Sequence, residues 1–169
     1  ILQLDKLAKI LRNQRIKGGA ITFDRSEVRF NLDADNNPIG VYFKISKDSN
    51  HLIEEFMLLA NRKVSEFVSL QKNGNPSNNT FIYRIHDDPD PTKLNALRDF
   101  VGNFGYKLDL ANNKTTTQSM NLLLKEVKGK AEENMVETLA MRTMSKAKYT
   151  TDNVGHYGLG FGYYSHFTS

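Results

Sequence analysis

The stretch DSNHLIEEFMLLANRKVSEFVSL, residues 48–70, carries the strongest helix signal in this 169-residue chain. Its apolar side chains recur at helical spacing and occupy an arc of about 180° on a helical projection. Asp48, Ser49 and Asn50 place side-chain oxygens where the first free N–H groups of a helix need acceptors. We therefore predict one long amphipathic helix here. Its expected packing face consists of Leu52, Ile53, Phe56, Leu59, Ala60, Val64, Phe67 and Val68.

Shorter elements are predicted on both sides of this helix. Helical spacing and helix-end signals indicate four more helices, at about 2–16, 91–101, 117–127 and 130–146. Runs of β-branched and aromatic residues indicate strands at 20–23, 28–32, 39–45 and 81–85. Turn-forming residues at 33–38 favour an antiparallel meander of the first three strands. No repeat or long linker divides the chain, so we expect one α+β unit with helices packed on a small antiparallel sheet.

The composition is that of a globular domain. Subtracting 19 Asp and Glu from 23 Lys and Arg leaves a formal charge of +4, with 39% hydrophobic and 25% charged residues. These values exclude a disordered tail. The absence of Cys excludes thiolate zinc sites, disulfide frameworks and cysteine nucleophiles, and it agrees with the reducing cytoplasm, where we expect the protein to act.

Two further expectations follow from what the sequence lacks. No apolar run approaches the roughly 18 residues that a membrane-spanning helix needs, so we expect no membrane partner. The chain opens at Ile1 without an initiator Met and without the pattern of a signal peptide. We therefore expect it to be a piece of a longer protein.

The last 21 residues differ from the rest in composition. They hold six of the 17 aromatic side chains and four of the 11 glycines. Glycine allows a ligand to approach the backbone closely, and interleaved aromatic rings can stack on bases, so single-stranded nucleic acid is one sensible partner. A compact loop packed on its own aromatic rings is the other interpretation. The chemistry of these residues alone leaves both open.

Three groups of polar residues need an interpretation. Glu54 and Glu55 fall on opposite margins of the apolar arc of 48–70, where a carboxylate could accept hydrogen bonds from ribose hydroxyls or could simply favour the helix N-terminus. The acids in HDDPDP, residues 86–91, suit turn formation and helix capping better than a metal site, because two prolines interrupt them. Arg142, Lys146 and Lys148 could form a phosphate track ahead of the tail, or a solvated helix face.

Familiar catalytic motifs are absent from the sequence. It contains no Gly-x-Ser-x-Gly elbow, no His-Glu-x-x-His zinc motif and no phosphate-binding loop. The four histidines are too scattered to predict a metal site. The glycine pattern at 155–160 lacks the strand, helix and acidic residue of a dinucleotide-binding fingerprint.

Two segments nevertheless resemble one known family. HLIEEFMLLAN at 51–61 and GHYGLGFGYYSHFTS at 155–169 are together similar to the catalytic domain of the ribonuclease II/ribonuclease R family, in sequence, order and separation. Supporting similarity comes from GGAITFD at 18–24, from YRIH at 83–86 with the Pro-Asp-Pro that follows, and from MRTMSKA at 141–147. The resemblance covers essentially the whole chain and is closer to the bacterial ribonuclease R branch.

The resemblance implies processive 3′-to-5′ degradation of single-stranded RNA to nucleoside 5′-monophosphates, by attack of water assisted by Mg²⁺. In that family the metal-binding aspartates precede the leading helix, and a catalytic arginine follows the His-Phe-Thr-Ser motif. Neither is present here. We therefore expect residues 1–169 to be the central part of one such catalytic domain, truncated at both ends and inactive in isolation, from a parent that is monomeric.

The resemblance also implies candidate RNA-binding residues. A ring at Phe23 is expected to stack on terminal bases, and one carboxylate of the pair at 54 and 55 to lie near the terminal ribose. His156, Tyr157 and His166 are expected in or beside the RNA channel. Without its continuation, the tail is expected to be displaced or mobile. A non-catalytic RNA-binding module on the same scaffold is the alternative function, and a purely structural role is a third.

Overall fold

The chain folds as an α+β arrangement, which confirms the predicted class. A computed structural model describes residues 1–23 and 27–168. The helices are α1 (Leu2–Lys17), α2 (Asp48–Ser69), α3 (Pro91–Gly102), α4 (Asn113–Val127) and α5 (Glu133–Thr143), with a 3-10 turn η1 (Tyr157–Leu159). The strands are β1 (Glu27–Leu32), β2 (Pro38–Lys44), β3 (Tyr83–Ile85) and β4 (Lys148–Thr150). None of the helices described has both the length and the apolar character needed to cross a bilayer.

The strands form two separate antiparallel pairs in place of one meander. β1 pairs with β2, and β3 pairs with β4, a strand that the sequence did not predict. Residues 20–23 form no strand. Ala20 and Ile21 are buried, and the Ile21 N–H donates to the Gly158 carbonyl at 3.0 Å, so this segment packs on the tail and does not join β1.

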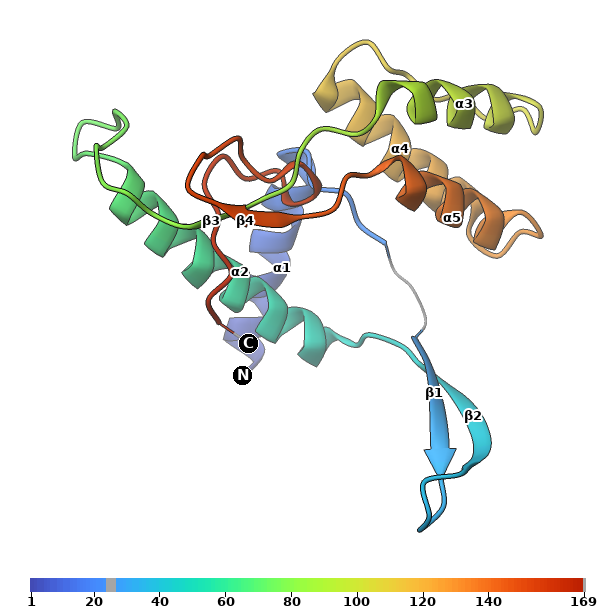
Figure 1. Ribbon diagram of the computed structural model, residues 1–169. Helices are drawn as coiled ribbons and strands as arrows, with labels where there is room; N and C mark the ends of the chain where they lie inside the picture. The colour runs from blue at the N-terminus through green and yellow to red at the C-terminus, as the bar shows by residue number, and fades with distance from the viewer. Residues whose placement is uncertain (24–26, 169) are drawn as a thin grey trace.

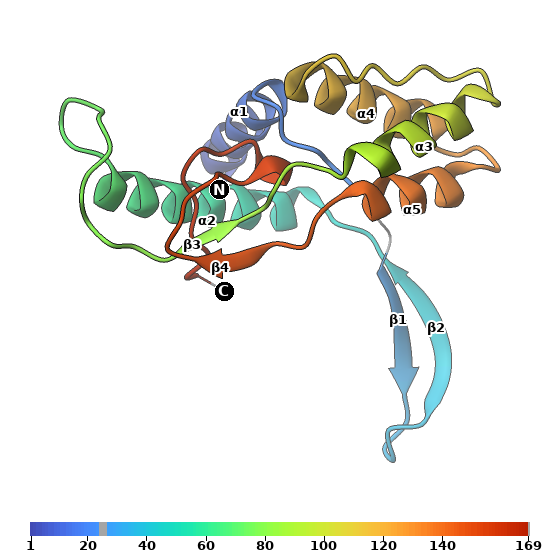
Figure 2. The same ribbon diagram turned by 45° about the horizontal axis from the view of Figure 1, so that its top comes forward.

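The β1–β2 hairpin projects away from the other elements, as Figures 1 and 2 both show. Its register places Val28 opposite Phe43 and Phe30 opposite Val41, so apolar side chains share one face. These four side chains are exposed. The hairpin therefore contributes little to the core.

The main apolar core lies among α3, α4 and α5, which Figure 1 shows grouped together. Its fully buried members include Val101, Met120, Val127 and Val136. Asp90 caps α3 as predicted, because its carboxylate accepts from the N–H groups of Thr92 and Lys93. Asn112 caps α4, which begins four residues before the predicted start.

Helix α2 has the predicted length but a different buried face. The expected apolar face is only partly covered, and Phe67 is among the most exposed side chains. The buried stripe is instead largely polar and consists of Glu55, Leu58, Asn61, Ser65 and Ser69. The reason is that α2 packs against α1 and the irregular tail, both of which present polar groups that need partners.

Adjacent leucines of α4 test the position of the core. Leu123 is 1% exposed and Leu122 is 55% exposed. We expect Leu123→Ala to lower the free energy of unfolding by about 2–5 kcal/mol, because it removes buried methyl groups and leaves a cavity. The same change at Leu122 should cost about 0.5 kcal/mol or less. Urea unfolding followed by circular dichroism measures both, and equal losses would contradict this core.

Candidate nucleic-acid interface

A pocket of about 1040 Å³ lies between α5, the segment that follows it, β3 and the tail. Four cationic side chains line it, Arg84, Lys93, Arg142 and Lys146. Three histidines, at 86, 156 and 166, line it as well. Among the described residues, no Asp or Glu contributes to this lining. The pocket therefore presents donors and positive charge, which suits an anionic ligand rich in acceptors.

Two smaller pockets adjoin it. One of about 530 Å³ shares Tyr164 and His166 with the large pocket, and one of about 450 Å³ shares Phe23 and Leu159 with it. Glu54 lines both of the smaller pockets. The three pockets thus share lining residues, and we call them together the basic groove.

The groove unites six of the eight residues that the sequence singled out. Phe23, Arg142, Lys146, His156 and His166 line the large pocket, and Glu54 lines the two beside it. These residues come from four separated segments of the chain, so their convergence is a property of the fold. Glu55 and Tyr157 lie outside it.

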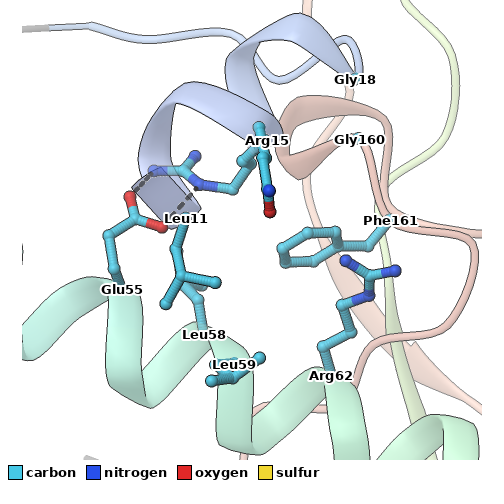
Figure 3. A pocket seen from close by; sticks show the side chains of 10 residues that line it. Leu11, Arg15, Gly18, Glu55, Leu58, Leu59, Arg62, Gly160 and Phe161 are labelled. Carbon is cyan, nitrogen blue, oxygen red and sulfur yellow. Dashed lines mark hydrogen bonds and ion pairs between the residues drawn. The ribbon is translucent and has the colours of Figure 1, made fainter. Parts of the chain in front are cut away.

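Glu55 does not sit at a helix margin, as the projection had suggested. Its side chain is 2% exposed and faces α1, where the Arg15 guanidinium donates to both carboxylate oxygens through Nε and Nη2 (Figure 3). Arg12 lies 3.7 Å from the same carboxylate. Glu55 is thus committed to joining α1 and α2. Glu54 also contacts Arg15, at 3.4 Å, and Arg12, at 3.7 Å, but 46% of its side chain is exposed, so it is the glutamate of the pair that a ligand can reach.

Tyr157 lies outside the groove and anchors the tail that forms one of its walls. Its hydroxyl accepts from Thr117 Oγ1 of α4 at 3.1 Å, and its backbone N–H donates to the His86 carbonyl at 2.9 Å. Burial raises the pKa of the Tyr157 phenol. The residue therefore ties the tail to α4.

The imidazole of His86 joins two walls of the groove. Its Nε2 donates to the Ser145 carbonyl at 2.8 Å, and its Nδ1 accepts from the Gly158 N–H at 3.0 Å. A carbonyl only accepts and an amide N–H only donates, so these contacts fix the neutral Nε2–H tautomer. Ser145 directly precedes Lys146, and the ring thereby positions this cationic segment against the tail.

His156 is held beside His86 as a second neutral ring. The two ring centroids are 5.1 Å apart, and the Tyr164 ring lies 5.3 Å away on another side. Burial, together with the nearby His86 and Arg84, lowers the pKa of His156 from 6.5 to about 4. At neutral pH this histidine therefore adds no charge to the groove.

Asn61 of α2 holds the end of the tail. This fully buried amide accepts at Oδ1 from the N–H groups of Phe167 and Thr168, each at 3.3 Å. Its Nδ2 lies 3.4 Å from His166 Nδ1, which is also 2.9 Å from the Tyr164 hydroxyl. The described tail residues are thus docked on α2, in contrast to the displacement expected from the sequence.

Comparison with known proteins identifies the family. A family model for the RNB domain matches residues 1–169. The chain belongs to the RNB domain family. Ribonuclease R of Aquifex aeolicus is 33% identical to it over 166 residues, which are 98% of this chain and 23% of that protein. The RNB chain described here therefore spans about a quarter of the length of that relative.

Solved structures agree with this assignment. The RNB chain matches Mycoplasma genitalium RNase R, in complex with ribose-methylated single-stranded RNA, with a TM-score of 0.82 and 26% identity over 98% of this chain and 25% of that one. The fold also matches yeast Ssd1, a pseudonuclease, with a TM-score of 0.64 and 20% identity over 98% of this chain and 20% of that one. The fold is thus shared with nuclease and pseudonuclease alike.

Four groove and tail residues of this RNB chain were not predicted to have a site role. They are Arg84, Lys93, His86 and Asn61. YRIH had marked Arg84 and His86 only as part of the family resemblance, and Asn61 had appeared only as the last residue of HLIEEFMLLAN. Arg84 lies between two buried residues of β3 and has its guanidinium 5.9 Å from the Tyr149 ring centroid. No local signal predicts that it faces the same pocket as Lys146.

The acidic turn of the RNB chain is not a metal site. Asp87 pairs with Lys148 at 3.2 Å, Asp88 accepts from Asn113, and Asp90 caps α3. Across residues 1–23 and 27–168, no group of three or more potential metal ligands comes together. These residues therefore do not fit a Mg²⁺ site of their own.

Substitutions at two glycines of the tail test whether the two hydrogen bonds of the His86 ring, which we call the histidine bridge, hold the groove together. A Cβ at Gly158 would lie 2.8 Å from His86 Nδ1, whereas a Cβ at Gly162 would meet nothing within 4 Å. We expect Gly158→Ala to lower the free energy of unfolding by about 1–3 kcal/mol, because the ring cannot move without breaking its two hydrogen bonds. Gly162→Ala is the control. Urea unfolding measures both, and a neutral Gly158→Ala would contradict the bridge.

Proposed function

We propose that this chain is part of a processive 3′-to-5′ exoribonuclease that hydrolyses single-stranded RNA to nucleoside 5′-monophosphates. The observation that carries the proposal is the basic groove, in which six separately predicted residues converge in a chain of the RNB family. Its relatives include proteins named ribonuclease R, and one of these was solved with single-stranded RNA.

Different residues of the groove would contact different parts of the RNA. Arg142 and Lys146 attract backbone phosphates, which gives affinity without sequence preference. The ring of Phe23, at the junction of two pockets, offers a stacking surface for a base. Glu54 offers an acceptor to ribose hydroxyls, which are absent from DNA. Together these contacts would hold a single strand along the groove.

Hydrolysis requires groups beyond those described. We propose that Mg²⁺ serves the full-length enzyme, where it would orient and activate water and stabilise charge on the phosphate oxygens. Its ligands would be aspartates outside these 169 residues, since no group of three or more potential metal ligands comes together among the described residues. The same reasoning supports the proposal that the 169-residue chain alone does not cleave RNA.

A non-catalytic RNA-binding module is the second candidate function. The fold is similar to that of the pseudonuclease Ssd1, so the same scaffold also occurs in a protein without nuclease activity. This similarity supports the binding module as an alternative. A purely structural role is less compatible with the cationic groove. For either RNA-binding function we propose a monomer that acts in the cytoplasm, which suits a chain without cysteine.

Digestion of 5′-labelled single-stranded RNA tests the proposal. We expect the full-length protein to shorten the RNA progressively from its 3′ end with Mg²⁺ and to stop when chelator is added. We expect the 169-residue chain to leave it intact under both conditions. Binding without cleavage by the full-length protein would contradict the nuclease and favour the binding module.

The groove cations predict a specific salt dependence. Arg142→Ala and Lys146→Ala should each weaken binding of single-stranded RNA and lower the slope of log affinity against log salt by about 0.7, because each removes one phosphate contact. Lys72→Ala is the matched control, since this exposed lysine follows α2 and lines none of the groove pockets. Fluorescence anisotropy over a salt series measures the slopes. Equal slopes for all variants would contradict the phosphate track.

A further inference from the structure

The orientation of the His156 ring determines which of its nitrogens carries the proton. Its Nδ1 accepts from the Leu159 N–H at 3.3 Å within η1. Because that amide only donates, Nδ1 carries the lone pair and Nε2 carries the hydrogen. The flanking rings of His86 and Tyr164 contact His156 edge-on and hold this orientation.

The Nε2–H of His156 is available to a ligand. No hydrogen bond of the described residues involves this nitrogen. No buried side-chain nitrogen or oxygen in the same residues lacks a partner, so Nε2 must be accessible and not enclosed. His156 lines the large pocket, so a ligand bound there lies beside its ring.

The charged groups around this N–H cannot accept a hydrogen bond from it, so the ligand must provide the acceptor. The described residues that line the pocket include no carboxylate, and the neighbouring His86 ring has both of its nitrogens occupied. The nearby charged groups that line the pocket are cations, which compete for acceptors and offer none. An RNA strand, with phosphate, ribose and base oxygens, supplies the missing acceptor.

We propose that His156 binds single-stranded RNA as a neutral hydrogen-bond donor through Nε2–H, inside a groove whose phosphate contacts are cationic. This inference rests on the proposed function and adds a second kind of contact to it. A neutral donor releases no counterion from the RNA, so its contribution to affinity does not depend on salt. Arg142 and Lys146 differ from it in that respect.

Binding of a fluorescein-labelled single-stranded oligoadenylate to the full-length protein, in EDTA to prevent hydrolysis, tests the inference. His156→Phe keeps an aromatic ring and removes the donor, and we expect it to weaken binding about five- to tenfold with an unchanged salt slope. His156→Gln keeps an N–H donor near the same position and should bind within about twofold of the wild type. Arg142→Ala should instead lower the slope by about 0.7.

The other possible results would contradict either the donor role of His156 or the proposed function. If His156→Phe bound RNA with wild-type affinity, or lost affinity together with a lower salt slope, His156 would not be a neutral donor. Equal losses in the Phe and Gln variants, at unchanged melting temperature, would overturn donation and indicate a packing role. In these cases the response of Arg142→Ala still supports RNA binding. A wild-type protein that does not bind the oligonucleotide would overturn the proposed function itself.

Discussion

The bridge made by His86 is the contact on which the groove depends. Its ring spans from the Ser145 carbonyl to the Gly158 amide and so connects the segment after α5 with the tail. Its backbone adds two further bonds, from its N–H to the Gly155 carbonyl and from the Tyr157 N–H to its own carbonyl. One residue thus fixes both walls just beyond the end of β3, where an isolated bridge to His156 is the pairing described. The absence of a side chain at Gly158 is what lets the tail approach the ring.

Contacts with the irregular tail, with β3 and with α1 explain the polar buried face of α2. Buried N–H and C=O groups need partners, and a segment that is neither helix nor sheet must obtain them from side chains. Asn61 supplies an acceptor to two successive amides, and the hydroxyl of Ser69 contacts that of Tyr83. Apolar residues on this face would leave these groups unpaired, at a cost of about 1–3 kcal/mol each. The pairing of Glu55 with Arg15 serves the neighbouring contact with α1 in the same way.

Periodicity predicted the positions of the helices because apolar spacing and caps are local properties of the sequence. The capping role of Asp90 and the extent of α2 follow from a few adjacent residues. The buried positions of Glu55 and Asn61 could not be predicted in this way, since their partners lie about 40 and 105 residues away in sequence. Residues 20–23 have the composition of a strand, but a long-range bond to the tail competes with pairing. The family resemblance gathered the groove candidates, yet only the fold separates Glu54 from Glu55.

The net charge of +4 understates how basic the groove is, and the reason is where the acids lie. Glu54 and Glu55 face the arginines of α1, Glu66 pairs with Arg62 and Lys63, and Asp87 pairs with Lys148. These pairs neutralise acids that lie outside the lining of the large pocket. Glu54 lines the two smaller pockets, and Lys93 of the large pocket lies 3.9 Å from Asp90, so the separation of charge concerns the large pocket, whose described lining holds no carboxylate. Charge separation within a nearly balanced sequence therefore produces the field that an RNA strand would meet. His156 is neutral and lies among those cations. It therefore adds no further positive charge that would repel them.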